Sequence, residues 1–441
     1  MKLRRFINLW LLSLTIAGSF FVVNDLPVIG SENSKRSGEV ARQSETPAPT
    51  RIIRGRAGYF ERLAPRPERD AAARQAWIEQ LRKDYSPSTD RWPAPLVDSG
   101  VEWKELGLLP SLPVSALDAP LEPKRILGQM LFFEPKLSTS GEMSCASCHD
   151  PDLGWADGRT VAFGTGRLEL KRNSPSILNV AHQSSFFWDG RATTLEDQAI
   201  QVLMNPEEMN SSPELIRQRL SASSDYQRAF RDAFGDEVIT LPRVAKAIAS
   251  FERTVLGGRS RFDAFLSGKS VALSDSALVG LDLFRREARC MNCHYGPLLS
   301  DGKFHDVGLS YFGRKYQDLG RHEVTGNHAD SGKFRTPSLR NVTATRPYMH
   351  NGLFELENVI NLYNAGMPTL VPKAEQENDP RFPVKSPHLK PLGLNPQDIT
   401  DLLEFLKALE EPRTRVRPPQ WPKLNDKTET LSLGSGTPPD R

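Results

Sequence analysis

The four cysteines of this 441-residue chain are confined to two short motifs of the same form. In each motif two residues separate a pair of cysteines, and a histidine follows the second cysteine at once. The motifs read CASCH at 145–149 and CMNCH at 290–294. Because no cysteine lies outside them, the pattern indicates one shared chemical role. The residues concerned are Cys145, Cys148, His149, Cys290, Cys293 and His294.

Three chemistries are compatible with cysteines at this spacing. A disulfide within each motif would leave the adjacent histidines unexplained, and a zinc site of four thiolates would require the two distant loops to meet. Covalent haem attachment explains every residue, because two thioether bonds hold the porphyrin edge and the next histidine ligates the iron. We therefore expect two covalently bound haem c groups with His149 and His294 as proximal ligands.

The sequence around the two motifs repeats. GQMLF at 128–132 and GLDLF at 280–284 precede the motifs, and related blocks that begin at Arg172 and Phe334 follow them. Two copies of one unit, each with its own haem, account for this repeat. Strand signals are sparse, whereas runs such as 241–256 have helical periodicity. We expect an all-α fold of two cytochrome c-like haem domains with an N-terminal extension.

The N-terminus has the pattern of an export segment. Lys2, Arg4 and Arg5 precede an apolar run at 6–23, which is typical of a signal peptide. The run is also just long enough for a membrane anchor, so both interpretations stay open. Since the basic residues remain inside, either one places the rest outside the cytoplasmic membrane. We expect a periplasmic protein, free or anchored to the inner membrane by this segment.

Composition shifts along the chain suggest six parts. The two CxxCH motifs and the helical runs lie in the middle of the chain, and polar, proline-rich segments flank them. The expected order is a signal peptide or anchor at 1–23, a disordered linker at 24–56, a partly helical extension at 57–120, a first cytochrome c-like domain at 121–270, a second at 271–412 and a tail at 413–441.

An ordered set of motifs covers residues 120–412. It runs CxxCH, RNSPxxLN, FWDGRxxxLxxQ, NPxEM, a second CxxCH and PYMHNG. This set resembles the bacterial di-haem cytochrome c peroxidase and MauG family, and it is more similar to the MauG-like members. The resemblance implies a peroxidatic haem on His149 and an electron-transfer haem on His294.

The resemblance also implies an open position on the first haem iron. In ordinary peroxidases of the family a histidine in the loop before RNSP ligates this iron, and the matching place here is near Thr165. No histidine lies between His149 and His182, although Lys171 or a methionine remains an alternative ligand. An iron with an open position can bind peroxide.

Two polar residues match the family's distal pocket. Cleavage of an O–O bond requires a group that moves a proton and a polar neighbour that favours charge separation. The resemblance implies that Glu208, in NPEEM, is the acid–base group and that Gln198, in LEDQA, is its hydrogen-bonding companion. The neighbouring Glu207 is expected to be solvated.

Two residues are candidates for the second ligand of the haem on His294. Met349, in PYMHNG, is one, because thioether sulfur is a common ligand of haem c iron. The resemblance favours Tyr363, in NVINLYNAG, since the family's methionine position falls there and a tyrosine at this place is similar to MauG. In the internal repeat Tyr363 matches Val202, which cannot bind iron. We expect one open site and one filled site.

Further residues match the family's inter-haem region. Trp188, in FFWDGR, matches a tryptophan between the haems and is expected to relay electrons. MauG has a tryptophan just before the second CxxCH, and the matching residue here is Ala288, so the exit route and the substrate are expected to differ. The resemblance also implies a calcium site formed by the Asn173 side chain and the carbonyls of Thr345 and Pro347, which suits a hard cation.

The leading interpretation is a peroxide-dependent di-haem oxidoreductase that oxidises a partner protein. That partner would be a donor cytochrome, a cupredoxin or a protein whose side chain is modified. The alternative is a non-catalytic di-haem electron-transfer cytochrome. The net charge of +3 and the lack of a long basic face argue against nucleic acid as a partner.

Overall fold

The expected signal peptide or anchor at 1–23 and most of the linker after it lie outside the described residues, as does nearly all of the C-terminal tail. None of the described helices is long and apolar enough to cross a membrane. The computed structural model describes residues 51–55, 58–85, 88–112, 121–412, 416 and 418–419.

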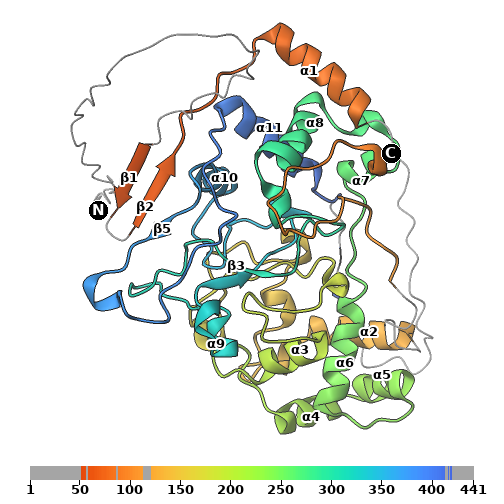
Figure 1. Ribbon diagram of the computed structural model, residues 1–441. Helices are drawn as coiled ribbons and strands as arrows, with labels where there is room; N and C mark the ends of the chain where they lie inside the picture. The colour runs from red at the N-terminus through yellow and green to blue at the C-terminus, as the bar shows by residue number, and fades with distance from the viewer. Residues whose placement is uncertain are drawn as a thin grey trace, which may run out of the picture. The chain divides into compact units, whose positions relative to one another are not determined.

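Five helices enclose a hydrophobic core next to the first motif (Figure 1). Side-chain caps start several of them: Thr194, Ser212 and Thr240 each accept a hydrogen bond from a backbone N–H in the first turn. Most of α6 is buried, and it packs against both α2 and α3. The helices are α2 (Leu121–Phe132), α3 (Leu195–Met204), α4 (Pro213–Ser221), α5 (Ser224–Phe234) and α6 (Leu241–Glu252).

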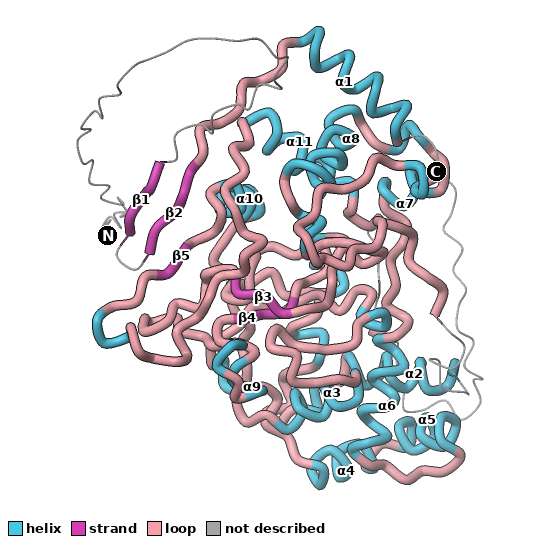
Figure 2. Tube along the Cα trace, in the orientation of Figure 1, coloured by secondary structure: helices cyan, strands magenta, loops and turns pink. Residues whose placement is uncertain are grey.

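A second core lies next to the second motif and is built mainly from α8 and α11, which pack against each other. Asn395 and Asp398 form a capping box at the start of α11. Loops connect most of the elements (Figure 2). The helices are α7 (Arg261–Leu266), α8 (Asp275–Asp282), α9 (His322–Thr325), α10 (Leu356–Asn364) and α11 (Pro396–Ala408).

The internal repeat corresponds to two equivalent helix crossings. Gly128 on α2 lies so close to α6 that a Cβ there would clash with the carbonyl oxygen of Ala247. Gly280 on α8 lies equally close to α11, where a Cβ would clash with the carbonyl oxygen of Asp401. The glycine of each GxxLF segment is therefore required for close packing. The repeated segments thus take equivalent positions, each at a close crossing of two helices.

The N-terminal extension packs onto the second core. Its helix α1 (Ala71–Asp84) buries Ile78 and Leu81 against that core. Arg74 forms an ion pair of 2.8 Å with Asp401 of α11. The hydroxyl of Tyr85 donates a 2.8 Å hydrogen bond to Asp282 of α8. The extension thus belongs to the structure around the second motif.

The described residues also form two small antiparallel sheets. The fold is therefore mainly helical, and not all-α as the sequence suggested. Residues 51–55 form strand β1, although the sequence places them in the disordered linker. They form a hairpin with residues 58–62, which also pair with residues 369–370, and local composition does not reveal this long-range pairing. The strands are β1 (Arg51–Gly55), β2 (Gly58–Arg62) and β5 (Thr369–Leu370) in one sheet, and β3 (Phe304–Asp306) and β4 (Lys333–Arg335) in the other.

Candidate functional site

Both CxxCH motifs adopt the same local conformation. A 3₁₀ turn begins at the first cysteine of each motif, and the histidine N–H donates back to that cysteine's carbonyl. Nδ1 of His149 lies 3.2 Å from the Trp155 carbonyl oxygen, and Nδ1 of His294 lies 2.9 Å from that of Leu299. Such a bond orients the ring and leaves Nε2 available to ligate a metal. Burial lowers the pKa of both histidines, which favours the neutral, ligating form.

Each motif lines a cavity of its own. Cys145, Cys148 and His149 line a first cavity of about 560 Å³. The cysteines and the histidine of the second motif line a second cavity of about 260 Å³. All four cysteines are free thiols, so neither motif forms a disulfide. Two thiols and an imidazole at the wall of a largely apolar cavity fit a covalently attached haem.

The thiols do not form a four-cysteine zinc site. Among the described residues one group of histidine, cysteine and acidic side chains has the spacing of a metal site, and it consists of Cys293, Asp301 and His305. It contains a single cysteine, and Asp301 is already bonded to His305 at 2.8 Å. The donor set at each motif therefore matches haem better than zinc.

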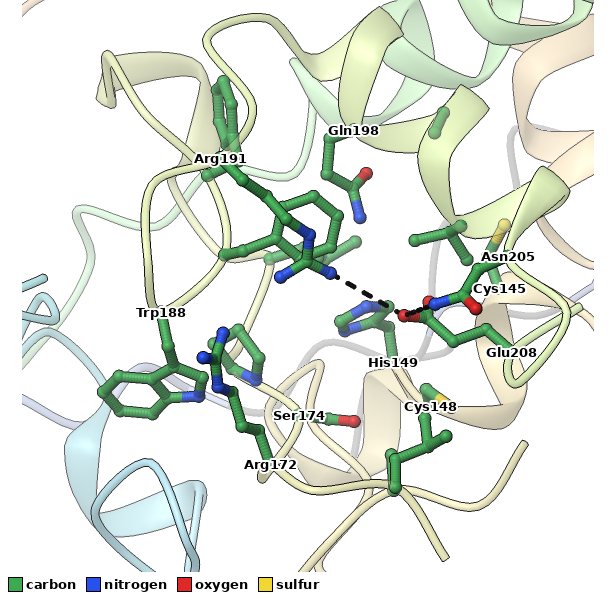
Figure 3. A pocket seen from close by; sticks show the side chains of 18 of the residues that line it. Cys145, Cys148, His149, Arg172, Ser174, Trp188, Arg191, Gln198, Asn205 and Glu208 are labelled. Atoms are coloured by element: carbon green, nitrogen blue, oxygen red, sulfur yellow. Dashed lines mark hydrogen bonds and ion pairs between the residues drawn. The ribbon is translucent and has the colours of Figure 1, made fainter. Parts of the chain in front are cut away.

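Polar side chains from three segments converge on the first cavity (Figure 3). Gln198 comes from α3, Arg191 from the loop before that helix and Glu208 from the turn after it. Asn205 Nδ2 donates a 2.9 Å hydrogen bond to Glu208 Oε1, and Arg191 Nη2 lies 3.7 Å from the same oxygen. Burial raises the pKa of Glu208, while Arg191 and Asn205 act in the opposite direction. Glu207, by contrast, is exposed.

Thr165 does not line the first cavity. Its hydroxyl and its N–H both donate to the backbone carbonyl of Glu208, at 2.6 and 2.9 Å. This pairing attaches the loop to the Glu208 turn. Within the described residues, the lining contains no histidine besides His149, although Lys171 and Met209 are part of it.

Both candidate ligands of the second haem, Tyr363 and Met349, line the second cavity together with His294. Tyr363 lies in the last turn of α10. Burial raises the pKa of its phenol, and the nearby cysteines act in the same direction. Met349 lies in the PYMHNG loop with a φ of 69°. The fold therefore brings both sequence candidates to the same site.

Trp188 lines both cavities. Its indole N–H donates a 2.9 Å hydrogen bond to the carbonyl of Asn173, which fixes the ring in the wall between the cavities. The ring also contacts His350 edge-on, with 6.4 Å between the centroids.

The three residues of the expected calcium site, Asn173, Thr345 and Pro347, line the second cavity. Asn173 is buried, and its Nδ2 donates to the Arg159 carbonyl at 2.7 Å. This hydrogen bond does not use the side-chain oxygen Oδ1 of Asn173. Oxygen donors of this kind fit a hard cation such as calcium.

Sequence reasoning missed several residues of these sites. Arg191 follows Trp188 in the FWDGR block, and Asn205 opens the NPEEM block, so both belong to motifs that the sequence displays. His350 is buried and stacks on Phe334 with 3.7 Å between centroids. It lies in the PYMHNG motif, but its contacts with Trp188 and Phe334 come from other segments, so its place beside the tryptophan could not be inferred.

A mainly helical protein with two CxxCH cavities and a tryptophan between them is a di-haem cytochrome by architecture. The sequence profile of the di-haem cytochrome c peroxidase family matches residues 122–271. The methylamine utilization protein MauG of Methylorubrum extorquens is 39% identical over 308 residues, which cover 69% of this chain and 83% of that protein. The cytochrome-c peroxidase IdrP1 of Pseudomonas sp. (strain SCT) is 36% identical over 334 residues, which cover 69% and 85%.

A solved structure agrees with these relatives. The crystal structure of a MauG-like protein associated with microbial copper homeostasis is 32% identical, with a TM-score of 0.60, and covers 71% of this chain and 95% of that one. The chain therefore belongs to the di-haem cytochrome c peroxidase family. It is a haem-binding oxidoreductase, a di-haem peroxidase.

Proposed function

We propose that the protein reduces hydrogen peroxide at the first cavity and takes the electrons from a partner protein. The observation that supports this most strongly is the asymmetry between the two cavities. The first presents Glu208 and Gln198 as polar groups, whereas the second presents the buried phenol of Tyr363. One site is thus suited to peroxide chemistry and the other to electron storage.

Covalently bound haem on each motif would supply an iron that binds peroxide or exchanges electrons. Reduction of one peroxide to two waters consumes two electrons and two protons. Glu208 would move a proton between the peroxide oxygens, and burial, which raises its pKa, favours the protonated form that can donate one. Asn205 and Arg191 hold its carboxyl group in place, and the amide of Gln198 would donate a hydrogen bond to the substrate.

Electrons would reach the first cavity through Trp188. Its position in the wall of both cavities supports this role. At the second cavity, Tyr363 would ligate the iron opposite His294, with Met349 as the alternative. A phenolate oxygen is a hard donor that favours the oxidised metal.

The proposed organisation follows the two hydrophobic cores. Residues 121–270 would form the domain of the first haem and 271–412 that of the second, with the extension packed on the latter. Asn173, Thr345 and Pro347 would hold a calcium ion next to the wall between the cavities. The protein would act outside the cytoplasmic membrane, where a donor cytochrome, a cupredoxin or a protein side chain would supply the electrons.

Electron paramagnetic resonance of the oxidised holoprotein, before and after one equivalent of peroxide, tests this proposal. We expect one high-spin haem that binds cyanide and one low-spin haem, with both signals lost after peroxide. Two low-spin haems that ignore cyanide and peroxide would overturn it and assign a non-catalytic electron-transfer cytochrome.

A further inference from the structure

Arg335 occupies an unusual position in the structure. It lies at the end of strand β4 and lines the first cavity, the second cavity and a third, polar cavity of about 150 Å³. Gln183 is the one other residue that the three cavities share. The wall between the two haem cavities thus contains a cation.

This cation has no counter-charge in the described part of the chain. Arg335 is 8% exposed, and its guanidinium makes one hydrogen bond, from Nε to the Phe187 carbonyl at 3.3 Å. No carboxylate of a described residue forms an ion pair with it. Burial alone lowers its pKa to about 10. A buried, unpaired guanidinium is costly, which indicates that an anion belongs beside it.

Three other arginines that are buried or partly buried each pair with a carboxylate. Arg340 pairs with Asp263 at 2.9 Å, and Arg285 pairs with Glu105. Arg172, on the first cavity, is bonded to both Asp189 and Asp318. Each of these guanidinium groups pairs with a carboxylate, whereas no carboxylate of a described residue pairs with Arg335.

Two aspartates in the walls of these cavities already have partners. Asp189, in the wall of the first cavity, is paired with Arg172 and Arg191. Asp301, in the third cavity, is paired with His305 at 2.8 Å. Since no carboxylate of a described residue pairs with Arg335, an anion from outside the described residues would complete this site. Haem carries two propionate carboxylates, and a guanidinium binds carboxylates in a bidentate manner.

We propose that Arg335 binds propionate carboxylates of both haems and joins the two cofactors at their shared wall. This inference rests on the proposed attachment of haem to both motifs. The backbone N–H of Arg335 donates a hydrogen bond to the backbone carbonyl of Trp188 at 2.8 Å. This bond links the residue that would bind the propionates to the proposed relay residue. Arg335 would set how closely the cofactor edges approach Trp188.

A shared cation has a measurable electrostatic effect. It disfavours the more positive, oxidised state of each iron, so its removal should lower both midpoint potentials. The effect should be felt at both haems, because Arg335 lines both cavities. A merely structural arginine would not shift both potentials in the same direction.

The test compares Arg335→Gln and Arg335→Lys in the holoprotein, with Lys333→Gln as the control. Lys333 lies on the same strand and pairs with Asp330, but it lines none of the three cavities. Redox titration of each variant measures both midpoint potentials, and a pyridine haemochromogen assay measures the haem content. We expect Arg335→Gln to lower both potentials, Arg335→Lys to keep them near wild type and Lys333→Gln to leave them unchanged.

Unchanged potentials in Arg335→Gln, a shift at one haem alone or an equal shift in Lys333→Gln overturns the inference. If Arg335→Gln loses haem, retention of haem and of both potentials by Arg335→Lys supports it, and equal loss in both variants overturns it. A wild-type protein without covalent haem would instead refute the proposed function.

Discussion

Asn205 Nδ2 donates a hydrogen bond of 2.9 Å to Oε1 of Glu208, three residues further along the same turn. The bond occupies one carboxyl oxygen and directs the group toward the first cavity, where Gln198 and Arg191 also lie (Figure 3). The turn therefore holds the carboxyl group of Glu208 partly buried in the wall of the cavity, while the adjacent Glu207, at the edge of the same wall, is exposed.

Glu208→Gln should slow the reaction with peroxide by about 10²–10⁴-fold, because an amide cannot transfer the proton. Stopped-flow absorbance of the holoprotein measures this rate. Glu207→Gln is the matched control, since it removes the same charge from the neighbouring, exposed position and should leave the rate unchanged. Equal rates in the two variants would remove Glu208 from the proposed chemistry.

Asn205→Ala should change the pH dependence of the reaction. The hydrogen bond from Asn205 lowers the pKa of Glu208, so its loss should raise that pKa further. The part of the pH–rate profile that reflects the titration of Glu208 should therefore move to higher pH. An unchanged profile would contradict this prediction. The Asn205→Asp variant, which adds a second carboxyl group, should move this part of the profile in the same direction.

Tyr363→Met should raise the midpoint potential of the second haem, because thioether sulfur favours the reduced metal more than phenolate oxygen does. The potential of the first haem should change little. Met349→Leu serves as the comparison, and it should leave both potentials near wild type. A large shift in Met349→Leu together with none in Tyr363→Met would assign the ligand to Met349 instead.

Glu252, at the end of α6, should make the protein less stable as the pH rises. It is 4% exposed, its Oε2 has no hydrogen-bond partner, and burial raises its pKa from 4.5 to about 8. Between these values the folded protein keeps a proton that the unfolded chain has lost. The contribution of Glu252 to stability is therefore greatest below pH 4.5 and is lost as the pH rises toward 8.

Glu252→Gln should remove this loss. The free energy of unfolding of the holoprotein should exceed wild type by on the order of 1–2 kcal/mol at pH 8 and show little gain near pH 4.5. Denaturant titrations at the two pH values measure the difference. Glu196→Gln is the control, because Glu196 is paired with Arg253 at 2.8 Å and its loss should bring no gain. A constant difference across the pH range would contradict the proposed titration.

Leu81→Ala should destabilise the protein by about 2–5 kcal/mol, because this extension residue is 2% exposed and part of the second core. Leu96→Ala, at a position that is 55% exposed, should change stability by less than about 0.5 kcal/mol. Thermal unfolding of both variants checks this. If the two substitutions had equal effects, the extension would not be an integral part of that core.

The chemistry of attachment could be inferred from sequence because it is local. The spacing of Cys145, Cys148 and His149 places two thiols and an imidazole in one turn, whatever surrounds them. The helices could be anticipated for the same reason, since caps such as Thr240 and the period of the apolar residues act within a few positions. The repeated GxxLF segment likewise pointed to two related units.

The residues of the wall between the cavities and the long-range partners depended on tertiary structure. Arg335 and Trp188 are distant in the chain, and only the folded protein places both in the wall of the two cavities. The strand at 58–62 and helix α1 find partners in segments hundreds of residues away. Residue type and spacing determine which chemistry a loop can perform. Burial, charge pairing and the contents of a shared wall are set by packing between segments, which local sequence does not encode.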